Sequence, residues 1–254
     1  MNQAPFNYLI PDWPAPDNVH AVITLRSRGS SNPPYNDFNL ATHVGDDLVQ
    51  VAANRSILCQ HLNLKMEPIW LDQVHGNDIV YAASDYSDIT ADGSFTDRED
   101  QPCVILTADC MPVLFCNLQG TQVAAVHAGW RGLCSGIISK ALDQFASGDT
   151  VMAYLGPAIS AKHFEVGAEV RTAFLSQVST NNEKESVKNA FKKASDNRYL
   201  ADLYSLARVE LARKGVTQIY GGEFCSYSQT ALFYSYRREK ICGRNASLIW
   251  LKSN

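Results

Sequence analysis

The pattern of hydrophobic positions predicts strands through the first two thirds of the chain, with helices between and after them. Short apolar runs, rich in β-branched residues and bounded by turn-forming residues, are typical of buried strands. Longer segments repeat apolar residues at intervals of three and four, which places them on one helix face. The predicted strands cover residues 19–25, 68–74, 78–83, 103–107, 113–116, 122–126 and 151–155, and the predicted helices cover 46–62, 133–145, 166–178 and 200–214.

Strands and helices interleave without strict alternation, which favours an α+β (mixed α/β) fold over a doubly wound one. Residues 179–197 are polar and rich in Lys and Glu, and we interpret them as an exposed excursion with one short helix. Folds of mixed class reach 254 residues as one unit. We therefore predict a single domain over residues 1–254, with mixed β-sheets flanked by helices.

Composition narrows the class of protein. Apolar residues make up 46% of the chain and charged residues 19%, so a packed core is expected and wholesale disorder is excluded. The net charge is −4 without a block of like charge, which disfavours a nucleic-acid partner because phosphate binding needs a basic face. We expect no membrane partner, since apolar runs stay short of a spanning length. Seven irregularly spaced cysteines argue against a disulfide framework and for a reducing, cytoplasmic setting.

Three segments place a ligand-type side chain at the end of an apolar run: 73–76 (QVHG), 108–110 (ADC) and 126–132 (VHAGWRG). Two histidines and a cysteine form a ligand set that zinc uses in catalytic sites, where three protein ligands leave a fourth position open. His75, Cys110 and His127 are far apart in the sequence, so only the fold can assemble them. The alternative is two structural histidines and a core cysteine.

The segment 129–132 (GWRG) lies between a predicted strand and a predicted helix. Free N–H groups at a helix N-terminus attract anions, and the guanidinium of Arg131 suits phosphate. The alternative is a glycine-rich turn in which Trp130 is a packing anchor. The residues alone support both interpretations equally.

Two further polar clusters are more ambiguous. Arg26 and His43 are suited to binding an oxyanion or protonating a leaving group, but the sequence alone favours a surface loop in which Asp46 caps the next helix. Arg237 and Arg238 follow an apolar run and have the charge to reach an anion. A solvated charge run is the favoured interpretation of that pair.

Together these motifs resemble the laccase-domain proteins, also called the multi-copper polyphenol oxidase-like family or peptidoglycan editing factors. Its members are regarded as purine nucleoside phosphorylases with adenosine deaminase and methylthioadenosine phosphorylase activity. Arg28 stands where the family usually has the first of two glycines. The motifs that carry the resemblance span nearly the whole chain and lie at 24–26, 38–46, 73–76, 108–113, 127–132, 156–159, 164–167, 234–238 and 243–244.

The resemblance implies one α–β domain with mixed sheets, in which His75, Cys110 and His127 bind zinc, or copper as the oxidase name suggests. It implies phosphorolysis of adenosine, inosine, guanosine and methylthioadenosine, and deamination of adenosine to inosine. Purine nucleosides and phosphate are then the partners, and no oligomeric state is implied. By residue type and motif position we assign catalytic roles to His43, Asp109 and Arg131, and substrate or phosphate binding to Arg26, Asn39 and Gly129.

Three alternatives remain from the sequence. A copper-dependent polyphenol oxidase of the multi-copper kind builds its centres from His-x-His pairs, and this chain has six histidines and no such pair. A cysteine hydrolase would use Cys110 as nucleophile and His75 or His127 as base. A non-catalytic role in editing cell-wall precursors is suggested by one of the family's names, but by no physical feature of the residues.

Overall fold

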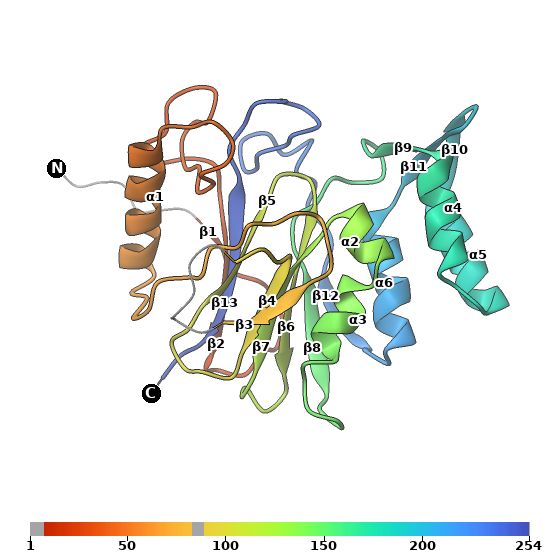
Figure 1. The fold of residues 1–254 in the computed structure, drawn as a ribbon, viewed down its shortest axis with the longest axis horizontal. Coiled ribbons are helices and arrows are strands. Elements are labelled where there is room, and N and C mark those ends of the chain that lie inside the picture. Colours follow the sequence, from red (N-terminus) through yellow and green to blue (C-terminus); the bar gives the residue numbers. More distant parts are fainter. Residues whose placement is uncertain (1–7, 83–88, 254) are drawn as a thin grey trace.

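Two large β-sheets pack face to face at the centre of the computed structural model, which describes residues 8–82 and 89–253 (Figure 1). Both sheets are built from segments far apart in the sequence. The first sheet contains, in spatial order, β1 (Tyr8–Leu9), β2 (Val19–Thr24), β13 (Asn245–Leu251) and β5 (Cys103–Thr107). The second contains β12 (Gln218–Gly221), β8 (Val151–Leu155), β6 (Met111–Asn117), β7 (Val123–Ala128), β4 (Gly93–Thr96) and β3 (Ile79–Tyr81).

The second sheet is mixed, as predicted. Strand β12 is parallel to β8 and β3 is parallel to β4, whereas β6 is antiparallel to both β7 and β8. Alternate side chains of β6 point to opposite faces, so Leu114 enters the core between the sheets and Phe115 enters the core under the helices. Because both faces of the sheet are covered, its strands are apolar almost throughout.

Helices cover the outer faces of both sheets (Figure 1). Helix α1 (Leu48–His61) packs Leu58 against Val104 and Leu248 on the outside of the first sheet. The second sheet is covered by α2 (Trp130–Cys134), α3 (Ile137–Leu142) and α6 (Leu203–Arg213). None of the helices in residues 8–82 and 89–253 is long and apolar enough to cross a lipid bilayer.

A smaller antiparallel sheet projects beyond α6 and is accompanied by two helices (Figure 1). It corresponds in part to the predicted polar excursion, which is largely exposed but also buries Val187 and Phe191. A capping box formed by Thr180 and Glu183 starts its second helix. The elements are α4 (Ala168–Ser176), α5 (Asn181–Asn189), β10 (Phe191–Ser195), β11 (Arg198–Ala201) and β9 (Glu165–Gly167).

Several predicted elements differ from the structure. The predicted helix 133–145 is interrupted between α2 and α3, because Gly136 has φ 86, a left-handed conformation that ends a helix. The predicted helix 166–178 begins as strand β9, since that segment pairs with β11. The predicted strand 68–74 makes only isolated bridges, at Ile69 and Asp72, within the described residues.

Helix α1 begins one residue later than the Asp46 cap implies. The carboxylate of Asp47 accepts the N–H of Val49 at 2.8 Å, so Asp47 is the N-cap. Asp46 instead accepts hydrogen bonds from the hydroxyl of Ser31 and the amide of Asn39. The polar loop before α1 is therefore held together by Asp46, and the interpretation of Asp46 as the cap is wrong.

The hydroxyl of Tyr204 on α6 joins two loops beside the second sheet. It accepts the N–H of Ala158 at 2.9 Å and lies 3.0 Å from the carbonyl oxygen of Gly156 and 2.7 Å from that of Phe224. The loop after β8 and the loop after β12 are thereby attached to the helical layer.

The variant Tyr204→Phe is expected to lower the free energy of unfolding by about 1–3 kcal/mol, because it leaves the buried N–H of Ala158 without an acceptor. Chemical denaturation measures the change. Tyr199→Phe is the matched control, since the Tyr199 hydroxyl makes no hydrogen bond within the described residues. Equal stability of the two variants would contradict the anchoring role.

Candidate active site

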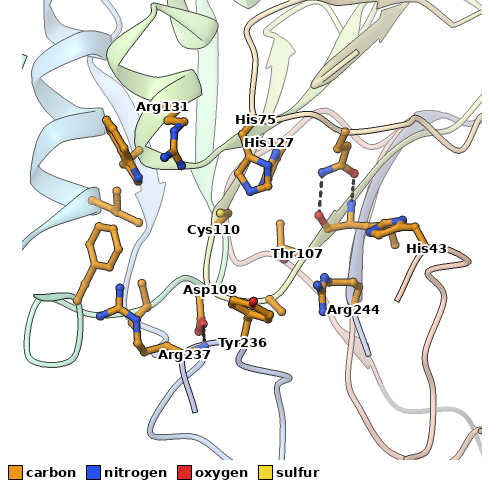
Figure 2. A pocket seen from close by; sticks show the side chains of 17 residues that line it. His43, His75, Thr107, Asp109, Cys110, His127, Arg131, Tyr236, Arg237 and Arg244 are labelled. Atoms are coloured by element: carbon orange, nitrogen blue, oxygen red, sulfur yellow. Dashed lines mark hydrogen bonds between the residues drawn. The ribbon is translucent and has the colours of Figure 1, made fainter. Parts of the chain in front are cut away.

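The loop 108–110 crosses from the first sheet to the second at one end of the sandwich, because β5 and β6 belong to different sheets. It places Cys110 immediately before β6. In the antiparallel ladder β6–β7, Pro112 pairs with His127 and Met111 with Ala128, which brings Cys110 opposite Gly129. His75 arrives from the loop that precedes β3. The fold therefore joins the three predicted ligand segments (Figure 2).

His75, Cys110 and His127 form a compact cluster. Their ligand atoms all lie within 4.8 Å of one another, and the two imidazole rings are 4.7 Å apart between centroids. His127 is buried, Cys110 is partly buried and His75 is exposed at the cavity. Two imidazoles and one thiol that converge in this way can hold a metal ion and fit the open site of zinc, with the fourth side left to the cavity.

The carboxylate of Asp92 lies behind the cluster and was not singled out from the sequence. Its Oδ1 is 2.7 Å from Nδ1 of His127 and accepts the N–H of His75 at 2.9 Å. Its Oδ2 accepts the N–H groups of Gly76 at 2.6 Å and Val74 at 3.2 Å. Burial raises the pKa of Asp92, but the hydrogen bonds from His127 and the backbone outweigh it and lower the pKa below its usual range.

Cys110 and His127 favour each other's charged forms. Burial raises the pKa of the Cys110 thiol, but His127 and His75 outweigh burial and lower the pKa to about 6. Burial lowers the pKa of His127, but Cys110 and Asp92 raise it to about 9. Cys110 is therefore a thiolate near neutral pH, which is the form that binds metals and the form that attacks as a nucleophile.

Two glycines let the backbone approach the cluster. A Cβ at Gly129 would lie 3.0 Å from Sγ of Cys110 and 3.3 Å from Cδ2 of His75. A Cβ at Gly132 would lie 2.6 Å from the carbonyl oxygen of Gly76, so α2 rests directly on the loop that carries His75. Helix α2 is only five residues long. The expected anion site at its N-terminus is therefore not supported, and Arg131 contributes through its side chain.

A cavity of about 540 Å³ opens beside the cluster, within the usual size range of ligand pockets. Figure 2 shows Arg131 and Arg237 on one side of it, His43 and Arg244 on the other, and Cys110 between them. An apolar wall completes it. This wall consists of Trp130, Ile159, Phe164 and Leu203, and the remaining lining residues are Gln73, His75, Leu106, Thr107, Ala108, Asp109, His127 and Tyr236.

The cavity is positively charged although the chain is acidic. Arg244 and Arg237 each donate to backbone carbonyls through Nη1 alone, among the described residues. Their remaining N–H groups, and those of Arg131, stay available to a ligand. Asp109, whose carboxylate also lines the cavity, is engaged in hydrogen bonds of its own. The arrangement is suited to an anion such as phosphate.

Asp109 links the crossing loop to the C-terminal loop. Its Oδ1 accepts the Ser226 hydroxyl at 2.7 Å, and its Oδ2 accepts the backbone N–H of Arg237 at 2.6 Å. Asp109 also has φ 90, a rare conformation for a residue with a side chain. Engagement of both oxygens favours a positioning role for Asp109 over proton transfer.

The polar residues Arg26, Asn39 and His43, which precede the metal-ligand motifs in the sequence, lie in different places in the structure. His43 lines the cavity, and burial together with Arg244 lowers the pKa of His43 below its usual range, so the imidazole is neutral at pH 7. Arg26 lies outside the lining: it donates to Glu239 at 3.3 Å and stacks on Tyr234. Asn39 is fully buried and also lies outside the lining, where it holds Asp46 and the backbone of Ala41.

The solvated charge run expected at Arg237 and Arg238 is wrong. Arg237 faces the cavity, and Arg238 is largely buried, with hydrogen bonds to three backbone carbonyls that include that of Ser226. Sequence reasoning also gave no role to Arg244 or Tyr236. Both lie in family motifs near the C-terminus, but that position alone carried no sign that the chain returns to the metal cluster.

Known proteins resemble this chain over nearly its whole length. Residues 20–252 match the model of the family described as multi-copper polyphenol oxidoreductase laccase. The chain is 47% identical over 245 residues to the purine nucleoside phosphorylase YfiH of Shigella flexneri and 46% identical over 245 residues to that of Escherichia coli strain K12, in each case over 96% of this chain and 98% of the relative. The crystal structure of Neisseria meningitidis protein NMB0706 has the same fold, with a TM-score of 0.91, 43% identity, and coverage of 97% of this chain and 100% of that one.

The variant Gly129→Ala is expected to lower zinc affinity by about tenfold, as loss of an orienting partner does, because its Cβ would press on Cys110 and His75. Its φ of −65 suits alanine, so the fold should persist. Competition with a chromophoric chelator measures the affinity.

Gly215→Ala is the matched control. Its Cβ would meet nothing within 4 Å, but its φ of 77 is strained for alanine. It should lower stability by about 1–2 kcal/mol and leave zinc affinity unchanged. Equal zinc affinity of both variants would contradict the close contact at Gly129.

Proposed function

Because the chain belongs to the multi-copper polyphenol oxidoreductase laccase family, we propose that it is a zinc-dependent enzyme that cleaves purine nucleosides with phosphate and deaminates adenosine. One observation carries the proposal: a His-Cys-His cluster and three guanidinium groups line one cavity of suitable size for a nucleoside. The names of the relatives, which are purine nucleoside phosphorylases, support the choice of substrate.

His75, Cys110 and His127 would hold the zinc. When bound there, zinc would supply a Lewis acid and lower the pKa of water, which is the chemistry that deamination of adenosine requires. The neighbouring histidines stabilise the thiolate form of Cys110, which is the form that binds metal, and Asp92 orients the ring of His127.

Phosphorolysis needs a phosphate oxygen at C1′ of the ribose while the purine base leaves. We place the phosphate on the side of the cavity formed by His43 and Arg244, where the guanidinium supplies charge and the neutral imidazole accepts the proton of a monoanionic phosphate. The wall of Trp130 and Phe164 offers aromatic surface for the base. Arg131 stacks on Trp130 of this wall, and we assign it the stabilisation of negative charge on the departing purine.

The copper oxidase alternative has less support. All six histidines lie in the described residues, and His20 and His163 stack on Trp250 and Tyr227 away from the cluster. Within those residues, no second group of three or more His, Cys, Asp or Glu side chains is close enough to hold another metal. One copper could replace zinc, because copper binds nitrogen and sulfur ligands more tightly.

A specific observation favours one other candidate, a cysteine hydrolase. The Cys110 thiolate lies beside His127, as a Cys-His dyad requires. Such a dyad works without a metal and is blocked when zinc occupies the thiolate. Metal dependence therefore separates the two functions.

The purified protein, with its metal content quantified, is expected to convert inosine and phosphate into hypoxanthine and ribose 1-phosphate, and to convert adenosine into inosine without phosphate. Chelation should abolish both activities and zinc should restore them. Chromatography of the nucleosides and bases measures each reaction. If the rate of inosine turnover did not depend on phosphate, the phosphorylase function would be overturned. Full activity after chelation would favour the Cys-His hydrolase. Phenol oxidation faster than nucleoside turnover would favour the copper oxidase.

The variant Arg244→Ala is expected to raise the KM for phosphate at least tenfold, because a hydrogen bond to a charged group contributes about 1.5–3 kcal/mol. Steady-state kinetics with varied phosphate measures the change. Arg198→Ala, an exposed position on β11, is the control. Arg26→Ala tests the earlier assignment: a larger rise in the phosphate KM for Arg26→Ala than for Arg244→Ala would place the phosphate at Arg26 instead.

A further inference from the structure

We infer that Asp92 is the positioning residue for both histidine ligands, and that it commits His127 to bind the metal through Nε2. This inference rests on the proposed zinc site. Asp92 does not line the cavity and its side chain is only 1% exposed, so it acts on substrate solely through the residues it holds.

The Asp92 carboxylate orients the ring of His127. Nδ1 lies 2.7 Å from Oδ1 of Asp92, and a carboxylate accepts a hydrogen bond only from a protonated ring nitrogen. Nδ1 therefore keeps its proton and Nε2 is the nitrogen left for the cluster. A carboxylate behind a ligand histidine also increases the basicity of the ligating nitrogen and stops the ring from rotating.

The same carboxylate binds the loop that carries His75. The N–H groups of Val74, His75 and Gly76 all converge on the same carboxylate. His75 has φ 61, a left-handed conformation that L residues adopt only when surrounding contacts hold it. The side chain of Gln73 ties the start of this loop to the backbone of Leu106. The three hydrogen bonds to Asp92 then fix the turn that bears His75.

Backbone hydrogen bonds hold Asp92 itself in position. Its backbone carbonyl accepts the N–H of His127 at 2.7 Å, and its backbone N–H donates to Asp78 at 2.9 Å. The next residue, Gly93, pairs with Val126 in the β4–β7 ladder, and a Cβ there would lie 2.9 Å from the Val126 side chain. The main chain and side chain of Asp92 are thus both fixed to the strand that bears His127. Asp92 therefore positions His75 and His127 relative to each other.

An asparagine at this position tests the inference with almost no change in volume. Four donors point at the two carboxylate oxygens of Asp92, and all four need an acceptor. An asparagine side chain has one oxygen and one NH₂ group. Its NH₂ group would therefore point at N–H donors that need an acceptor. Asp92→Asn should therefore release either the His127 ring or the His75 loop while leaving the core packing intact.

Asp92→Asn is expected to lower zinc affinity by about 10- to 100-fold, the usual effect of removing the partner of a ligand histidine. Competition with a chromophoric chelator measures the affinity, and circular dichroism confirms the fold. The matched control is Asp78→Asn, whose exposed carboxylate forms a surface ion pair with Lys140 and should change zinc affinity less than twofold.

Nitrogen-15 NMR of the zinc-loaded wild-type protein, labelled at histidine, gives a second readout that needs no variant. His127 should show a protonated Nδ1 and a metal-bound Nε2. Zinc bound through Nδ1 would overturn the inference, and so would a folded Asp92→Asn protein with wild-type zinc affinity. Failure of the wild-type protein itself to bind zinc would instead overturn the proposed function, so the two failures are distinguishable.

Discussion

The site depends on one topological constraint: β5 and β6 follow each other in the chain but lie in different sheets. The connection between them must cross the open end of the sandwich, and it carries Cys110 across that end. Strand β7 is hydrogen-bonded to β6, so His127 arrives at the same height, and the loop before β3 brings His75. Ligands 17 to 52 residues apart in the sequence meet because a rigid packed core holds these strand ends in place.

Negative charge lies behind the metal-ligand cluster, and positive charge lies in front of it at the cavity. Behind the ligands, the buried carboxylate of Asp92 faces His127 and compensates its positive charge. In front, the guanidinium groups of Arg131, Arg237 and Arg244 face the cavity, each stacked on an aromatic ring. An acidic chain thus presents a locally positive cavity, which attracts an anion more strongly than its net charge of −4 suggests. The carboxylate of Asp109 also lines the cavity, but it accepts two hydrogen bonds from the C-terminal loop.

Several local patterns were sufficient to predict structure, and several were not. The strand at Val151–Leu155 and the helix ending before Gly215 follow directly from apolar runs and a left-handed glycine. Arg28, where the resemblance implies a glycine, has φ 70, a conformation that glycine adopts without strain. The helix 133–145 failed as a prediction because its apolar spacing continues through Gly136, where the backbone turns.

The sequence by itself determined the candidate ligands His75, Cys110 and His127, the mixed fold class and the family, because these are carried by residue type, short-range spacing and motif identity. Only the tertiary structure decided which polar residues join them. It placed Arg244 and Arg237 in the cavity, removed Arg26 and Asn39 from it, and revealed Asp92 behind the histidines. The physical reason is that local periodicity reports which face of an element is buried, whereas the meeting of distant loops is set by how two sheets pack and cross.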